Sequence, residues 1–241
     1  MRKILNLSPN FSKKTRKFNK IKFIIIHYTG MQSEIASIKR LKNKKAKVSC
    51  HYLINKQGKI IQMVPENKIA WHAGISRWKS YRNLNINSIG IELVNKGHRF
   101  GYEKFSDLQI NKLIVLCKNI RRKYNIKKNN ILGHSDISPL RKIDPGEKFP
   151  WEKLSEYNLG SWYKKLGNDQ KKSKIGENRN LFFKNLFKIG YRYFNVNVPK
   201  KSDRFIISAF QRRYTPRNVT GELNQKTLLI SNFLAKSQKF S

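Results

Sequence analysis

Short apolar runs rich in β-branched residues recur between residues 20 and 135, and they constrain the fold of this chain more than any other feature. They lie at residues 22–26, 88–94 and 131–133, and their length and composition are typical of buried strands. Residues 106–124 follow a helical pattern with Ser106 as N-cap and apolar side chains along one face. Strands that alternate with helices predict the α/β fold class, with a central mixed β-sheet flanked by helices.

Two further patterns lie between the first two runs. Residues 33–41 have helical spacing, and Ser33 is placed to cap that helix. Residues 51–55 and 59–64 read as two short strands joined across Lys56-Gln57-Gly58, which indicates a hairpin. These elements extend the same arrangement of sheet and helices.

The composition changes after residue 166. The next fourteen residues, GNDQKKSKIGENRN, contain one apolar side chain and are typical of a linker. Three amphipathic helical patterns follow, at 181–189, 203–214 and 224–234, and residues 1–22 carry eight basic and no acidic residues. The predicted organisation is a basic N-terminal arm (1–20), an α/β domain (21–166), a linker (167–180) and a small C-terminal three-helix domain (181–241).

The chain has 52 Lys and Arg residues against 14 Asp and Glu residues, for a formal net charge of +38. Such a surplus suits nucleic-acid binding when it is concentrated on one face and interleaved with aromatic residues. Here the basic residues are spread evenly along the sequence, and no nucleic-acid-binding motif accompanies them. We therefore expect no nucleic-acid partner.

No apolar run approaches the about 18 residues of a transmembrane helix, so we expect no transmembrane segment. Residues 1–22 lack the apolar stretch and cleavage site of a signal peptide, which favours a cytoplasmic location. Cys50 and Cys117 have apolar neighbours and no CxxC spacing, so we predict two small buried hydrophobes rather than a disulfide. We expect a monomer.

Acidic residues are scarce in this chain, and Asp144 is one whose position resembles that of two histidines, at a strand end or in a tight turn. His27 ends the first strand run, His134 directly follows the last, and Asp144 lies in a turn set by Pro145 and Gly146. Such groups can converge, because open α/β sheets bind ligands beyond their strand ends. Two imidazoles and one carboxylate leave the fourth position of a tetrahedral site open, which is typical of catalytic zinc. We predict one Zn²⁺ per chain; the alternative for any single histidine is a hydrogen-bonded core residue.

Two more residues suggest chemistry at that site. Glu92 alternates with apolar residues in IGIELV, and burial there would raise its pKa toward that of a general base. Lys142 precedes Asp144 by two residues and is placed to stabilise an oxyanion in the same cleft. The alternatives are a glutamate paired with one of the many basic residues, and a solvated lysine.

Four blocks of sequence, in unbroken order over roughly residues 20–165, are motifs of one family. They read IIIHYTG, SCHYLINKQGKIIQMVPENKIAWHAG, SIGIELVN and GHSDISPLRKIDPGEKFPW. Together they resemble the zinc-dependent N-acetylmuramoyl-L-alanine amidases of the AmpD/AmiD type, which share a fold with peptidoglycan recognition proteins. The family's metal ligands fall on His27, His134 and Asp144. Its catalytic glutamate falls on Glu92 and its active-site lysine on Lys142.

The resemblance implies an active enzyme, with residues 21–166 as its catalytic domain. The implied reaction is hydrolysis of the amide between N-acetylmuramic acid and L-alanine of the peptidoglycan stem peptide, in cell-wall turnover or recycling. Peptidoglycan or a muropeptide is then the partner. The alternative is a non-catalytic muropeptide- or wall-binding protein on the same fold, against which the intact Glu92 and Lys142 argue.

Three residues are candidates for substrate contacts: Trp71 and His72, in the cleft loop WHAG of the family, and Asn95, just after the Glu92 strand. The C-terminal stretches LFFKNLFKIGY and ISAFQRRYTPRNVTGELNQKT resemble a peptidoglycan-binding three-helix module. AmiD-type enzymes carry such a module and AmpD lacks one, so this organisation favours the AmiD side. It also makes a periplasmic or wall-associated location the alternative to the cytoplasm.

Overall fold

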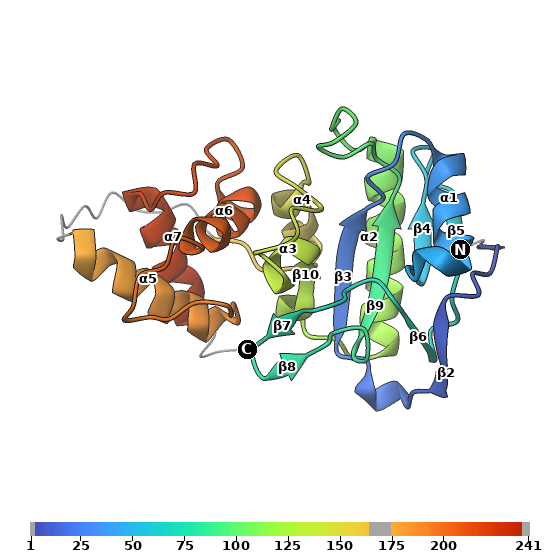
Figure 1. Cartoon of the computed structure of the whole chain (residues 1–241), viewed down its shortest axis with the longest axis horizontal. Coiled ribbons are helices and arrows are strands. Elements are labelled where there is room, and N and C mark those ends of the chain that lie inside the picture. Colours follow the sequence, from blue (N-terminus) through green and yellow to red (C-terminus); the bar gives the residue numbers. More distant parts are fainter. Residues whose placement is uncertain (1–2, 164–174, 238–241) are drawn as a thin grey trace.

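A six-stranded mixed sheet forms the centre of the molecule in the computed structural model, which describes residues 3–163 and 175–237. Its strand order is β1-β5-β4-β9-β3-β10 (Figure 1), which confirms the predicted α/β class with a mixed sheet. The strands are β1 (Ile4–Leu5), β3 (Phe23–Tyr28), β4 (Tyr52–Ile54), β5 (Ile60–Gln62), β9 (Ser88–Leu93) and β10 (Ile131–Gly133).

The inner strands β4, β9, β3 and β10 are mutually parallel, and β5 pairs antiparallel with β4 as the predicted hairpin. Parallel pairing brings the carboxyl ends of β9, β3 and β10 to one edge of the sheet, where the candidate site residues gather. The helices around the sheet are α1 (Glu34–Lys42), α2 (Asp107–Lys123), α3 (His134–Ile137) and α4 (Trp151–Glu156). Ser33 and Ser106 cap α1 and α2 as predicted.

The two faces of the sheet pack against different partners. Side chains alternate along a strand, so Ile24 and Ile26 of β3 point to one face and join Ile91 in a core under α2. On the opposite face, Phe23 and Ile25 join an apolar cluster that runs through Trp78 and Leu132 into the C-terminal helices. The second cluster is therefore shared between the sheet and the C-terminal part of the chain.

The three predicted C-terminal helices are present as α5 (Ile175–Ile189), α6 (Asp203–Tyr214) and α7 (Gln225–Ser237), and they lie beside β10 and α3 (Figure 1). Helix α5 begins before residue 181, inside the predicted linker; residues 164–174 of that region lie outside the described ones. The division into domains stays a prediction.

Residues 3–20 are more regular than their composition indicates. Strand β1 pairs with β5, and β2 (Phe11–Thr15) pairs antiparallel with β6 (Lys68–Ala70). Arg16 is buried, and its guanidinium donates to the carbonyl oxygens of Glu66 and Ser88. The basic N-terminal segment therefore forms paired strands, because backbone pairing does not require apolar side chains. A second hairpin joins β7 (Arg77–Trp78) to β8 (Tyr81–Arg82).

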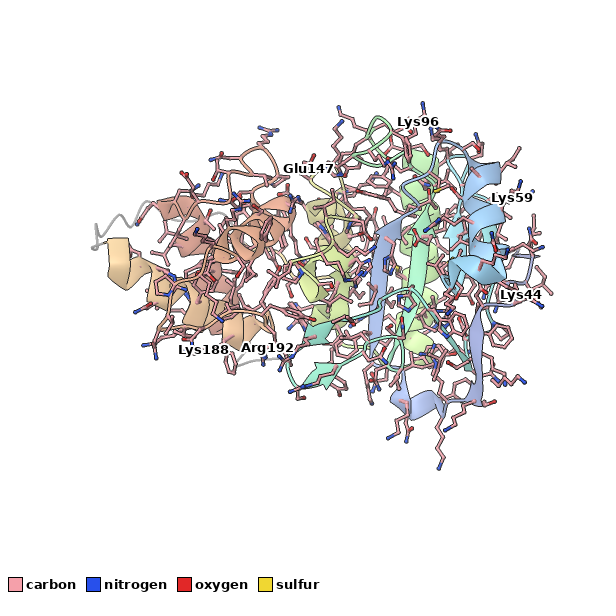
Figure 2. The ribbon with its side chains drawn as sticks, viewed as in Figure 1. Lys44, Lys59, Lys96, Glu147, Lys188 and Arg192 are labelled. Carbon is pink, nitrogen blue, oxygen red and sulfur yellow. The ribbon has the colours of Figure 1, made fainter. Side chains whose placement is uncertain are left out.

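Basic side chains project from well-separated parts of the molecule. Lys44 and Lys59 lie at the right-hand end of the view, and Lys188 and Arg192 lie on the lower side of the C-terminal helices (Figure 2). This distribution agrees with a charge that is not gathered on one face. Within the part of the chain that the structure describes, no helix is long and apolar enough to cross a membrane.

Candidate active site

Three predicted ligands from three parts of the chain meet at one point. His27 lies near the end of β3, His134 begins α3 directly after β10, and Asp144 lies in the following turn. The Nδ1 atoms of His27 and His134 are 3.0 Å apart, and each is 3.1 Å from Oδ2 of Asp144. All three residues are buried. The Ser135 N–H donates to the Asp144 carbonyl oxygen at 2.9 Å, which joins the two turns that carry His134 and Asp144.

A chain of hydrogen bonds behind His27 fixes the position of its ring proton. The chain of hydrogen bonds runs from His27 through His72 and Ser88 to the carbonyl oxygen of Leu84. A carbonyl oxygen can only accept, so the Ser88 hydroxyl donates to it at 2.5 Å. Nε2 of His72, 3.1 Å from the Ser88 oxygen, must therefore donate to Ser88, which leaves Nδ1 of His72 as an acceptor. That acceptor lies 3.0 Å from Nε2 of His27, so the proton of His27 lies on Nε2. Nδ1 of His27 then directs a lone pair at the cluster.

A backbone carbonyl likewise orients the ring of His134. Its Nε2 lies 3.1 Å from the Ala73 carbonyl oxygen, to which it must donate. In the neutral ring, Nδ1 of His134 therefore also carries a lone pair toward the cluster. Two imidazole lone pairs and a carboxylate oxygen face one another without a proton between them, and a cation would relieve their repulsion. This donor set fits a divalent metal that accepts nitrogen and oxygen ligands, such as Zn²⁺.

The electrostatics of His27 agree with a neutral ring. Burial, together with the neighbouring His134, lowers the pKa of His27 to about 4, so the ring is neutral near pH 7.

Glu92 stands next to His27 on the adjacent strand, since the two residues are register partners in β9 and β3. Its Oε2 is buried and has no hydrogen-bond partner, and it forms no ion pair with any described Lys or Arg residue. Burial raises the pKa of Glu92 to about 8, the charge of Asp144 adds to that rise, and Lys142 opposes it. The structure therefore does not pair Glu92 with a basic side chain.

Lys142 is half-buried beside the cluster. Its charge lowers the pKa of both Glu92 and His27, so it lies within electrostatic reach of both. Among the described residues, no ion-pair partner neutralises Lys142. The structure thus brings together all five residues predicted as ligands and catalytic groups.

The three residues predicted to contact substrate have other surroundings. His72 is buried, with one ring nitrogen facing His27 and the other facing Ser88. Asn95 is 1% exposed; its Nδ2 donates to the Glu103 carbonyl and its Oδ1 accepts from the Gly97 N–H. Trp71 is half-buried, with Nε1 3.3 Å from the Ser12 hydroxyl. Their substrate contacts stay predictions, which this geometry does not favour for His72 and Asn95.

Several residues near the site have no counterpart in the sequence predictions. A Cβ atom at Gly90 would lie 2.3 Å from the His72 ring, so only glycine lets that ring approach β9. The glycine inside an otherwise apolar strand was the available signal. On the rim, Nδ1 of His98 lies 2.9 Å from the Tyr28 hydroxyl and Nε2 lies 3.1 Å from Glu147. Nothing in the spacing of those residues indicates that they meet.

A buried pair of histidines and an aspartate beside an unpaired glutamate is a donor set typical of metal-dependent hydrolases. The family model described as N-acetylmuramoyl-L-alanine amidase matches residues 17–147, more than half of the chain. The chain belongs to this family and is an amidase, as the sequence motifs predict.

Individual relatives agree with that assignment. N-acetylmuramoyl-L-alanine amidase AmiD of Escherichia coli is 34% identical over 232 residues, which cover 90% of this chain and 83% of AmiD. The anhydro-N-acetylmuramyl-L-alanine amidase AmpD of Haemophilus influenzae is 44% identical over 108 residues, which cover 44% of this chain and 56% of AmpD. AmiD therefore matches the C-terminal part of the chain as well, whereas the match to AmpD covers less than half of it.

Solved structures show the same relationship. The solved structure of AmiD of E. coli with anhydro-N-acetylmuramic acid-L-Ala-D-γ-Glu-L-Lys has a TM-score of 0.80 at 32% identity, and the match covers 94% of this chain and 92% of the chain in that structure. AmpDh3 of Pseudomonas aeruginosa in complex with anhydromuramic pentapeptide has a TM-score of 0.80 at 31% identity and covers 95% of each chain.

Proposed function

We propose that this chain uses zinc to hydrolyse the amide between N-acetylmuramic acid and L-alanine of the peptidoglycan stem peptide. The observation that carries the proposal is the convergence of three buried lone-pair atoms beside the unpaired Oε2 of Glu92. The relatives AmiD and AmpDh3 were solved with anhydromuramic peptides, which supports anhydro-muropeptides as the substrate class. That substrate points to the recycling of wall fragments.

His27, His134 and Asp144 would hold the ion. Zinc bound there supplies Lewis-acid chemistry, which activates water and polarises a carbonyl group. The protein's own contribution to metal binding is orientation: the carbonyls of Leu84 and Ala73 determine, through hydrogen bonds, which nitrogen of each ring faces the cluster.

Glu92 acts as the general base and then as the general acid. Its Oε2 has no partner to displace, and it lies beside His27, so it is free to accept a proton from the attacking water. A pKa of about 8 without a bound ion keeps Glu92 mainly protonated near neutral pH, and the positive charge of an ion at the cluster would lower that pKa toward the ionised form that accepts the proton. Protonated Glu92 then delivers that proton to the departing amine of alanine.

Lys142 stabilises the negative charge that develops on the scissile carbonyl oxygen. Its ammonium group has no ion-pair partner among the described residues, and its field already reaches Glu92 and His27. A fixed positive charge in a site walled by buried groups stabilises a transition state more than the same charge in water.

The C-terminal part of the chain has a separate proposed role. We propose that residues 181–241 form a peptidoglycan-binding-like domain, which the match to AmiD over 90% of this chain supports. The net charge of +38 would attract the anionic wall polymer or the stem-peptide carboxylates.

The test is product analysis. The full chain is incubated with an anhydromuramoyl tripeptide, with and without a chelator, and the products are identified by mass spectrometry. We expect the anhydro-sugar and a peptide with free N-terminal alanine, loss of both with chelator, and recovery with Zn²⁺. A chain that binds zinc and retains the muropeptide uncleaved would instead be the non-catalytic binding protein.

A further inference from the structure

Asp136 is a buried carboxylate close to the metal site that the proposed chemistry does not use. It lies in α3, two residues after His134, and is 1% exposed. Its Oδ2 accepts from the N–H of Gly133, the residue before His134, at 2.8 Å. Asp136 therefore closes the turn that presents His134 to the cluster.

Both oxygens of Asp136 are also bound by the C-terminal part of the chain. The Tyr191 hydroxyl donates to Oδ1 at 2.5 Å, and Arg213 of α6 forms a buried ion pair with Oδ2. Burial and the Asp136 charge raise the pKa of Tyr191 well above its usual value, so this hydroxyl keeps its proton. Arg213 also donates to the Ile131 carbonyl at 3.2 Å, which is the first residue of β10. Residues 191 and 213 thus hold both the strand before His134 and the turn that carries it.

Docking of the C-terminal helices does not by itself require this network. Ile137 and Leu132 already share an apolar cluster with Phe210 and other side chains of α5–α7. A buried ion pair loses hydration, and its net stabilisation is often no greater than that of apolar side chains of the same size. Unlike apolar packing, the network fixes the orientation of the Asp136 carboxylate, because both of its oxygens are bound. That carboxylate lies two residues from the metal ligand His134.

We propose that Asp136, Tyr191 and Arg213 form a positioning network through which the C-terminal helices hold the His134 turn in its metal-binding geometry. The inference rests on the metal centre proposed above. It assigns the C-terminal helices a part in the amidase site in addition to any contact they make with the cell wall.

The test measures the metal site directly in the full-length chain. Tyr191→Phe removes one hydroxyl and keeps the ring that packs against Trp78 and Phe210. Metal affinity is measured by competition with a chromophoric chelator, and ligand geometry by the visible absorption of the Co²⁺-substituted protein. We expect Tyr191→Phe to weaken metal affinity about 10- to 100-fold, as is typical of groups that orient ligands, and to change the cobalt spectrum. Arg213→Lys keeps the charge but cannot hold Asp136 and Ile131 together, and it should act in the same direction.

Arg179→Met is the matched control. Arg179 of α5 forms an ion pair with Asp203 at 2.5 Å that also joins two segments of the C-terminal part but contacts no part of the His134 turn. This variant should lower the melting temperature and leave metal affinity and the cobalt spectrum unchanged. The network has no positioning role if Tyr191→Phe and Arg213→Lys lower only the melting temperature, or if Arg179→Met weakens metal binding equally. If the unmodified chain binds neither Co²⁺ nor Zn²⁺, the metal centre itself is refuted, and this inference with it.

Discussion

The two faces of the central sheet use the same strands for opposite purposes. Toward α2, Ile24, Ile26 and Ile91 pack into a layer of buried apolar side chains. Toward the other side, residues His27 and Glu92 of the same strands bring an imidazole and an unpaired carboxylate oxygen into a buried region. The first face is stabilised by removing apolar area from water, whereas burying polar groups on the second is unfavourable unless their chemistry is used. Substitutions on the apolar face should therefore lower the free energy of unfolding, whereas substitutions on the polar face should lower metal binding or turnover.

The largest effect is expected from removing a metal ligand. His134→Ala leaves two donor atoms at a site that needs three, so metal binding and hydrolysis should both be lost. Metal content of the purified variant and turnover of an anhydromuramoyl peptide check this. Chelation of the unmodified chain should reproduce the loss and added zinc should reverse it, whereas full hydrolysis by His134→Ala would contradict the assignment.

The next largest effect distinguishes loss of the general base from loss of the metal. Glu92→Gln keeps the size of the side chain and removes its ability to accept a proton, so turnover should fall about 10²- to 10⁴-fold while zinc content stays at one per chain. The matched control is the neighbouring residue on the other face. Ile91→Val should keep full turnover and lose about 0.5–1.5 kcal/mol of unfolding free energy. Equal loss of turnover in both variants would remove the functional distinction between the faces.

A larger truncation on the apolar face should destabilise the folded protein and leave zinc binding unchanged. Leu113 of α2 is fully buried in that core, so Leu113→Ala should lower the free energy of unfolding by about 2–5 kcal/mol. Denaturant melts give that value, and zinc affinity of the folded protein should match the unmodified chain. A change in zinc affinity as large as that in stability would show that the two faces are coupled.

The smallest effect concerns the hydrogen-bond chain behind His27. Ser88→Ala removes the acceptor of the His72 proton and frees both rings to exchange tautomers. We expect zinc to bind about tenfold more weakly, as measured by chelator competition, and the free energy of unfolding to fall by about 1–3 kcal/mol because the buried Nε2 of His72 loses its partner. An unchanged affinity would mean that the chain through Ser88 does not orient His27.

The metal cluster could be predicted from the sequence because its members occupy strand ends and a Pro-Gly turn. The role of His72 could not, because the position of a loop residue does not reveal which ring it approaches, and only Gly90 hinted at close contact. The contact between Arg213 and Asp136 was harder still to predict. Arg213 is one of 52 basic residues, and 77 positions separate it from Asp136. The periodicity of the sequence predicts the three C-terminal helices, but it does not predict the polar contacts that they make with the His134 turn.

The central claim is that two imidazole nitrogens and one carboxylate oxygen of this chain bind a catalytic zinc ion. Zinc-edge X-ray absorption on the full-length protein tests it most directly, because the method counts and identifies the atoms bound to the metal. We predict one zinc per chain in a shell of nitrogen and oxygen atoms only, with zinc–nitrogen distances of about 2.0–2.1 Å. Absence of bound zinc, or a sulfur atom from Cys50 or Cys117 in that shell, would contradict the claim.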